Sequence, residues 1–287
     1  MHKQPVVLVG YNRPQYFFSC AVALEEQSKD REVYLFLDGE RSEEEKHLVD
    51  AYEEIFEKHF PHGTCFRSNE NLGVAFNTRR AREETFELCN SAVFIEDDLI
   101  LNPFYMDIMD SLMEQLKNED SVGMVNAYGG NTTRKLGENS LENQINKKNK
   151  IVTMDHTLAY GAWKNKYEKI KPILTEYYQL LPQEYRARPH NEILKLWRSK
   201  GISESMTTTS QDAATVMSML LNEQTKISTY GNNLLYIGEW GEHSRPQDFK
   251  RYEWDEWPVM NELVTEYELT ADIFKQTLSE LKERYWR

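Results

Sequence analysis

Three carboxylates stand in a row in the stretch AVFIEDDLILNP, which covers residues 92–103. Four apolar residues come directly before Glu96, Asp97 and Asp98, and they predict a buried β-strand. Adjacent carboxylates repel one another, and burying an unpaired carboxylate is costly. A hard cation such as Mg²⁺, Mn²⁺ or Ca²⁺, which prefers oxygen ligands, would relieve both problems. A solvated acidic turn is the alternative, and the elements around the triplet must decide between the two.

Strands and helices alternate through the first half of the chain. Strands are predicted at residues 6–9, 33–37, 65–66, 92–95 and 122–125, with helices at 15–27, 42–59, 76–89 and 102–117. Ser42 and Glu45 have the spacing of a capping box, and Asn102 followed by Pro103 is typical of a helix start. The alternation predicts parallel strands in a doubly wound α/β sheet, which binds ligands outside the carboxyl ends of its strands.

The second half of the chain has a different pattern. Residues 129–150 are polar and aperiodic, which predicts a long mobile loop of the kind that covers active sites. A short strand is predicted after it at 151–154, with helices at 163–181, 192–200, 211–221 and from about 261 to the C-terminus. Since no linker separates the halves, we expect one continuous domain.

Composition excludes several classes of protein. The 287 residues, of which 40% are hydrophobic, are enough for a sizeable core. A net charge of −13 argues against a general nucleic-acid binder. The chain shows no apolar stretch of membrane-spanning length and no signal-peptide layout, and Cys20, Cys65 and Cys89 lack metal spacing. We therefore expect a cytoplasmic protein with reduced cysteines.

Polar side chains follow three of the predicted strands. Tyr11, Asn12 and Arg13 come after the first strand, Asp38 after the second, and the acidic triplet after the fourth. The carboxyl ends of parallel strands share one edge of a sheet, so we expect these groups to converge. Arg13 could bind a phosphate with both guanidinium nitrogens, although a surface ion pair is the alternative.

These residues resemble the GT-A-fold glycosyltransferases, nucleotide-sugar-dependent inverting enzymes that include family-two-like bacterial enzymes and the N-acetylglucosaminyltransferase I group. The stretches that carry the resemblance are VVLVGYNRP, YLFLDGE, NENLGVAFNTRRA, AVFIEDDLILNPFYMD and NLLYIGEWGEHS. The resemblance implies a Rossmann-like, mostly parallel central sheet flanked by helices. It also implies that residues 1–128 form the nucleotide-sugar-binding half, and that residues 129–287 form the acceptor-binding half with a C-terminal helix.

The resemblance gives the acidic triplet a role as the DXD-type motif, which holds Mn²⁺ or Mg²⁺ against the diphosphate of the donor. Asp98 is then expected to be the direct metal ligand, and Asp97 to contact the ribose or to reach the metal through water. Glu96 is expected to be structural and held by a nearby donor. His243, in the Gly-x-His context of GEHS, is expected to complete the metal site.

The same resemblance implies contacts to the nucleotide sugar from the glycine-containing segment NENLGVAFNTRR as well as from the strand ends. The residues expected to make these contacts are Tyr11, Asn12, Arg13, Asp38, Asn71, Gly73, Arg79 (or Arg80) and Asp97.

An inverting transfer needs a general base that takes the proton of the acceptor hydroxyl. The resemblance places it at Asp212, two residues after the candidate helix cap Ser210, although this chain has Gln211-Asp212 where the family often has Glu-Asp. The alternative is that Asp212 only favours the helix dipole. Asp155 is the second candidate base. Residues 161–163 are expected near the acceptor, and Trp240, Tyr252, Trp254 and Trp257 are candidates for a sugar-stacking platform.

We therefore expect a metal-dependent inverting glycosyltransferase, either hexosyl or N-acetylhexosaminyl. It would move a sugar from a nucleotide sugar, with UDP as the most frequent carrier in the family, to a hydroxyl acceptor such as a glycan. A non-catalytic nucleotide- or glycan-binding protein of the same fold is the alternative, and the direction in which Asp212 points separates the two. A sugar-phosphate nucleotidyltransferase ranks lower, because GYNRPQYF lacks a glycine-rich basic loop.

Overall fold

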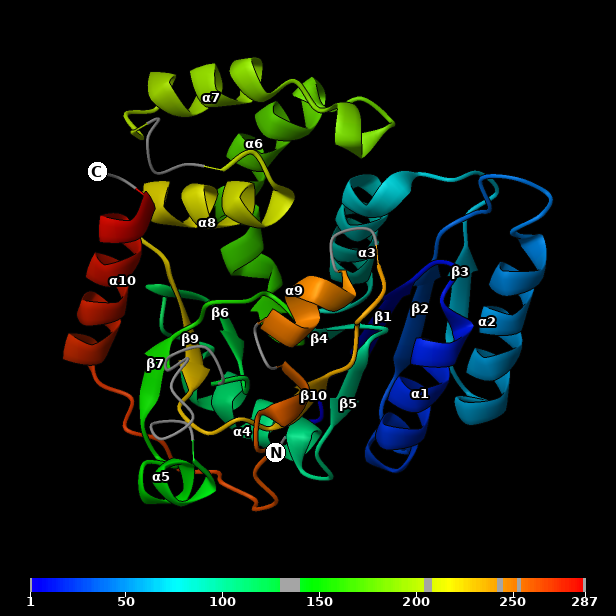
Figure 1. Cartoon of the computed structure of the whole chain (residues 1–287). Helices are drawn as coiled ribbons and strands as arrows, with labels where there is room; N and C mark the ends of the chain where they lie inside the picture. The colour runs from blue at the N-terminus through cyan, green and yellow to red at the C-terminus, as the bar shows by residue number, and fades with distance from the viewer. Residues whose placement is uncertain (1, 130–139, 204–207, 242–244, 252–253, 286–287) are drawn as a thin grey trace.

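An eight-stranded sheet forms the centre of the molecule, in the order β3-β2-β1-β4-β8-β6-β9-β7 (Figure 1). The computed structural model describes residues 2–129, 140–203, 208–241, 245–251 and 254–285. The strands are β1 (Val6–Gly10), β2 (Val33–Leu37), β3 (Thr64–Arg67), β4 (Ser91–Glu96), β6 (Val122–Asn126), β7 (Ile151–Thr153), β8 (Tyr160–Trp163) and β9 (Thr225–Thr229).

Helices cover both faces of this sheet. Successive residues of a strand face opposite sides, so Val6 and Leu8 enter one core while Val7 enters the other. The first core is closed by α1 (Pro14–Ser28), α2 (Lys46–His59) and α4 (Tyr105–Leu116). The second is closed by α3 (Gly73–Leu88), α6 (Lys164–Leu180), α7 (His190–Ser199) and α8 (Gln211–Leu221). The predicted fold class, a mostly parallel central sheet flanked by helices, is confirmed.

The carboxyl ends of β1, β2, β3 and β4 lie at one edge of the sheet, because these four strands are parallel. The next strand, β8, runs antiparallel to β4, with Phe94 opposite Tyr160. This strand was not predicted, and residues 161–163 lie inside the sheet rather than at an acceptor surface. A Cβ added at Gly161 would overlap the Met113 side chain on α4.

Smaller elements complete the fold. They are β5 (Leu99–Leu101), α5 (Leu141–Asn146), η1 (Tyr185–Ala187), β10 (Leu234–Tyr236), α9 (Pro246–Arg251), η2 (Trp254–Glu256) and α10 (Ala271–Tyr285). Strand β5 follows the acidic triplet and pairs antiparallel with β10. The C-terminal helix α10 begins ten residues later than predicted and lies beside β7 and β9 (Figure 1). No helix in the described ranges is long and apolar enough to cross a bilayer.

Part of the predicted loop 129–150 is a docked helix. Ser140 caps α5 by accepting a hydrogen bond from the Asn143 amide. Gln144 is fully buried, accepts from the Asn232 amide at 2.8 Å and donates to the Pro258 carbonyl at 3.0 Å. Residues 140–150 do not line the cavity described below, and residues 130–139 fall outside the described part of the chain.

Helix starts were predicted with mixed success. Ser210 caps α8 as predicted, accepting from the Ala213 amide at 3.2 Å. The prediction of a capping box at Ser42 and Glu45 is wrong. Helix α2 begins at Lys46 without a side-chain cap, and the Glu45 carboxylate accepts a hydrogen bond from Asn12 instead. The Asn102 side chain accepts from the Phe104 amide at 3.1 Å, two residues on, and α4 starts only at Tyr105.

Candidate functional site

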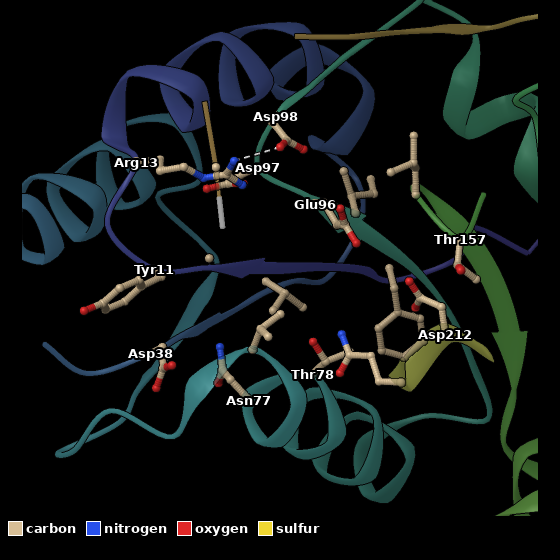
Figure 2. A pocket seen from close by; sticks show the side chains of 18 of the residues that line it. Tyr11, Arg13, Asp38, Asn77, Thr78, Glu96, Asp97, Asp98, Thr157 and Asp212 are labelled. Carbon is tan, nitrogen blue, oxygen red and sulfur yellow. Dashed lines mark hydrogen bonds and ion pairs between the residues drawn. The ribbon is translucent and has the colours of Figure 1, made fainter. Parts of the chain in front are cut away.

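A cavity of about 690 Å³ opens where β1, β2 and β4 end (Figure 2). It is lined mainly by polar and charged side chains from the strand ends, from α3 and from the start of α8. Of the residues expected to form the site, those that line the cavity are Tyr11, Asn12, Arg13, Asp38, Asp97, Asp98 and Asp212. Segments more than a hundred residues apart in the sequence thus line the same cavity.

Arg13 binds both aspartates of the acidic triplet. Its Nη1 lies 2.9 Å from Oδ2 of Asp98, and its Nη2 pairs with Oδ1 of Asp97 (Figure 2). Both aspartates are only 3% exposed. Burial and the neighbouring Asp98 raise the pKa of Asp97 to about 7, although Arg13 acts in the opposite direction. The alternative of a solvated acidic turn therefore does not hold for these two residues.

The loop after β10 covers Asp98. The Ile237 amide donates to the Asp98 carbonyl at 2.9 Å, and a Cβ added at Gly238 would overlap the Asp98 carboxylate. Beneath this loop Oδ1 of Asp98 is buried and has no hydrogen-bond partner among the residues that the structure describes. A buried acceptor in that state is destabilising unless it gains a donor or a cation.

Glu96 faces the cavity and is not the structural residue that was expected. No donor of a described residue hydrogen-bonds its carboxylate, which is exposed within the cavity while protein encloses it on the remaining sides. Desolvation raises the pKa of Glu96 well above its ordinary value, and the charges of Asp98 and Asp212 raise it further. Figure 2 shows Glu96 between Asp98 and Asp212.

These features fit a hard divalent cation. Asp98 has an unpartnered oxygen, and one guanidinium stands against three consecutive carboxylates. Within the described ranges no three His, Cys, Asp or Glu side chains are clustered as a metal site. His243 lies outside those ranges. Two residues before it, Gly241 sits against Arg13, and a Cβ there would lie 3.0 Å from Nη1.

Asp38 lines the cavity, yet its carboxylate is occupied by the protein. Oδ1 accepts from the amides of Leu72 at 2.7 Å and Gly39 at 3.0 Å. Oδ2 accepts from the Gly73 amide at 2.9 Å and from Nδ2 of Asn71 at 3.2 Å. Asn71 and Gly73 therefore hold Asp38 and do not themselves line the cavity. Gly73 has φ +78°, a conformation that favours glycine.

Arg79 points away from the cavity. Its Nε pairs with Glu83 at 3.1 Å on the same helix, and its guanidinium lies 5.0 Å from the centre of the Tyr178 ring. Arg80 also stays outside, paired with Glu84. The face of α3 that lines the cavity is spaced i, i+3, i+4 and i+8, and it consists of Val74, Asn77, Thr78 and Arg82. Helical periodicity could have identified Arg82 in place of Arg79.

Asp212 lies across the cavity from Tyr11 and Asp38, on the first turn of α8 (Figure 2). Its side chain is exposed within the cavity, so it points where a catalytic base would have to point. Asp155, the second candidate base, does not line the cavity, because its carboxylate pairs with Arg284 on α10. The next three residues, 156–158, do line it.

Glu45 organises the rim near Tyr11 and was not predicted as a site residue. It accepts from the Tyr11 hydroxyl, from Nδ2 of Asn12 at 3.1 Å and from the Arg41 amide at 3.2 Å. The Arg41 guanidinium lies 5.3 Å from the centre of the Tyr11 ring. The only sequence signal at Glu45 was the apparent capping box.

Aromatic rings form another part of the wall. Tyr236 meets Trp254 edge to face with ring centres 5.0 Å apart, and His156 lies near Trp254 and Tyr128. All four line the cavity. Of the tryptophans expected to stack on a sugar, Trp257 is buried and Trp240 is 65% exposed without lining the cavity. Tyr252 falls outside the described residues.

Comparisons with known proteins found only distant similarity. No family model and no curated protein sequence matches the chain. Among solved structures, a cytidylyltransferase from Leptospira borgpetersenii is 15% identical over 60% of this chain and 65% of its own, with a TM-score of 0.37. The galactosyltransferase LgtC, in complex with donor and acceptor sugar analogs, is 12% identical over 90% and 97%, with a TM-score of 0.36.

A third structure is glucosyl-3-phosphoglycerate synthase from Mycobacterium tuberculosis, in complex with Mn²⁺, UDP and glucosyl-3-phosphoglycerate. It is 11% identical over 98% of this chain and 80% of its own, with a TM-score of 0.37. These similarities are too distant to indicate a family or an activity.

Proposed function

We propose that this protein is a metal-dependent inverting glycosyltransferase of the hexosyl or N-acetylhexosaminyl type. It would move a sugar from a nucleotide sugar, UDP-linked by resemblance, to a hydroxyl acceptor such as a glycan. The observation that carries the proposal is one cavity at the strand ends, with the buried carboxylates of Asp97 and Asp98 on one wall and an accessible carboxylate, Asp212, on another.

The nucleotide would bind at the end of the cavity formed by Tyr11, Asn12 and Asp38. Asp38 would act there mainly by fixing the turn before α3, since four internal hydrogen bonds occupy its carboxylate. Arg13 lies between this end and the triplet and would contact the diphosphate.

Asp98 would hold Mn²⁺ or Mg²⁺ through its unpartnered Oδ1, with Asp97 or Glu96 nearby and His243 as the further ligand. When bound, the cation would neutralise the diphosphate as it leaves. Arg13, which holds Oδ2 of the same carboxylate, would then lie close to a second cation and would be repelled by it.

Asp212 would be the general base. In an inverting step the acceptor oxygen forms a bond to the anomeric carbon and its proton passes to the carboxylate, while the bond to the diphosphate breaks and its electron pair leaves with the nucleotide. Asp212 suits this role because it reaches the cavity from the side opposite Tyr11 and Asp38. Glu96, which lies between Asp98 and Asp212, is another carboxylate exposed in the cavity.

The acceptor would approach along the aromatic wall. Tyr236, Trp254 and His156 present ring faces and edges there, and sugars commonly pack against such rings. Residues 156–158 would position it beside Asp212.

Calorimetry with UDP tests the donor half of the proposal. We expect Mn²⁺ to strengthen UDP binding by at least about tenfold in the wild-type protein, and Asp98→Asn to abolish that gain. Asp272→Asn, on an exposed carboxylate that does not line the cavity, is the matched control and should behave as wild type. UDP affinity that does not depend on Mn²⁺ in any variant would exclude the metal assignment.

A further inference from the structure

Arg82 is a buried cation in the cavity wall without a carboxylate partner. Its residue is only 5% exposed and lines the cavity. Its two hydrogen bonds go to hydroxyl groups, those of Tyr160 at 2.7 Å and Thr215 at 3.2 Å. No carboxylate in the described part of the chain forms an ion pair with it. Buried charges are normally paired, so Arg82 lacks, among the described residues, the anionic partner that a buried guanidinium usually has.

Rigid elements fix the direction of the Arg82 guanidinium. The Tyr160 ring on β8 stacks on Phe94 of β4 with centres 5.2 Å apart and planes at 16°. Thr215, on α8, donates its own hydroxyl proton to the Gln211 carbonyl at 3.0 Å, so it can only accept from Arg82. Nε and one of the two Nη1 protons are thereby committed, and Nη2 has no hydrogen-bond partner among the residues that the structure describes.

Tyr160 adds a second donor. Its oxygen accepts from Nε of Arg82, and no described acceptor takes the phenolic proton. Among the described residues, Arg82 and Tyr160 therefore keep only donors unpaired: one proton on Nη1, two on Nη2 and one hydroxyl proton. The complementary ligand atom is an oxygen that accepts hydrogen bonds.

The position of this pair indicates which part of the ligand it meets. Arg82 lies one helical turn beyond Thr78 on α3, farther from the Asp38 end. Burial raises the pKa of Tyr160 and Arg82 lowers it, while Asp212 and Glu96 raise it further, so both carboxylates lie within electrostatic range. The pair thus belongs to the part of the cavity next to the candidate base, away from the nucleotide end.

We propose that Arg82 and Tyr160 form a subsite that binds an oxygen atom of the transferred sugar. This oxygen belongs either to a hydroxyl group or to the carboxylate of a uronic acid. The inference rests on the proposed function, which places the transferred sugar between the triplet and Asp212. A carboxylate would neutralise the buried guanidinium and form charge-assisted bonds, whereas a hydroxyl would satisfy Nη2 without neutralising it.

Affinities for UDP and for UDP-sugars test the proposal, because UDP lacks the group that the subsite would bind. Dissociation constants of UDP, UDP-glucose and UDP-glucuronate are measured with Mn²⁺ on the wild-type protein, Arg82→Met and Tyr160→Phe. We expect Arg82→Met to weaken at least one UDP-sugar by roughly tenfold or more and to leave UDP unchanged. A larger loss for UDP-glucuronate identifies a carboxylate, and equal losses identify a hydroxyl.

Arg79→Met is the matched control, since it removes a guanidinium from the same helix outside the cavity. It should leave all three affinities unchanged. If Arg82→Met proves unfolded in a melting experiment, Tyr160→Phe decides the question, because it removes one donor with almost no change in volume. Equal weakening of UDP and both UDP-sugars would overturn the subsite and leave Arg82 a structural role. Failure of the wild-type protein to bind UDP at all would instead overturn the proposed function.

Discussion

Nη1 of Arg13 lies 2.9 Å from Oδ2 of Asp98, the carboxylate that we propose as the metal ligand. The same guanidinium pairs with Asp97, so one cation of the protein itself is shared between two of the three acids. The charges of Asp97 and Asp98 in turn raise the pKa of Arg13, although burial acts to lower it. Arg13 and a divalent metal would therefore be drawn to the same carboxylates, where the two cations repel each other, and a diphosphate would give Arg13 another anion to bind.

Arg13→Gln should bind Mn²⁺ in the absence of nucleotide about tenfold more tightly than the wild-type protein, because the competing cation is gone. In the wild-type protein UDP should raise the affinity for Mn²⁺, and Mn²⁺ should raise the affinity for UDP by the same factor. Manganese binding followed by electron paramagnetic resonance measures both quantities. Identical Mn²⁺ affinities in the two proteins would show that Arg13 does not compete with the metal.

Asp212→Asn keeps the size of the side chain and removes the proton acceptor. We expect turnover to fall by roughly a hundredfold to ten-thousandfold, with donor affinity nearly unchanged. If Asp212 serves only the helix dipole, the variant should instead lose about 0.3–1 kcal/mol of stability and keep its turnover. Glu96→Gln, assayed in parallel, tests the other accessible carboxylate, and a larger loss of turnover there would move the base to Glu96.

Asp38→Ala should destabilise the protein, because three backbone amides and the Asn71 side chain lose their acceptor. We expect a loss of roughly 2–4 kcal/mol in the free energy of unfolding, measured by urea denaturation. Asp30→Ala, on a largely exposed carboxylate paired only with Lys3, is the control and should change stability little. Wild-type stability in Asp38→Ala would mean that these bonds do not hold the turn.

Lys166 provides a prediction about pH. It is 1% exposed, its Nζ donates to the Leu116 carbonyl at 2.7 Å, and burial lowers its pKa to about 7. In the unfolded chain the pKa is about 10.4, so between about pH 7 and pH 10 the unfolded state binds more protons than the folded state. The free energy of unfolding should therefore rise with pH across this window.

Lys166→Met removes this titration. The stability of the wild-type protein relative to the variant should increase by about 2 kcal/mol between pH 7 and pH 9. Urea unfolding of both proteins at each pH measures the difference. If the free energies of unfolding of the two proteins change equally with pH over that range, Lys166 keeps an ordinary pKa in the folded state.

Local patterns predicted the elements whose signals are complete within a few residues. The apolar run Val33–Leu37 coincides with β2, and Ser210 caps α8, because each depends on its neighbours in sequence. Strand β8 was missed because YGAW is short and its stability comes from β4 and β6, which precede it by many residues. The alternation of strands and helices predicted parallel strands, and parallel strands predicted that their carboxyl ends would lie close together.

Side-chain partners were harder to predict, because they depend on the packed structure. Arg79 pairs with Glu83, whereas Arg82 faces the cavity. In the sequence the two arginines differ only in the face of the helix on which they lie. Glu45 has the spacing of a capping residue, yet Tyr11 and Asn12 take its carboxylate once β1 places them beside it. Likewise, the exposure of Glu96 to the cavity depends on the direction in which β4 ends.

Release of nucleotide from nucleotide sugars tests the central claim most directly. The wild-type protein, Asp98→Asn, Asp212→Asn and the surface control Asp272→Asn are incubated with Mn²⁺, a panel of nucleotide sugars and candidate glycan acceptors, and free nucleotide is measured. We predict acceptor-stimulated release from at least one donor by the wild-type and control proteins, and its loss in both cavity variants. Binding of a nucleotide sugar without release from any donor, with every acceptor, would contradict catalysis and favour a binding protein of the same fold.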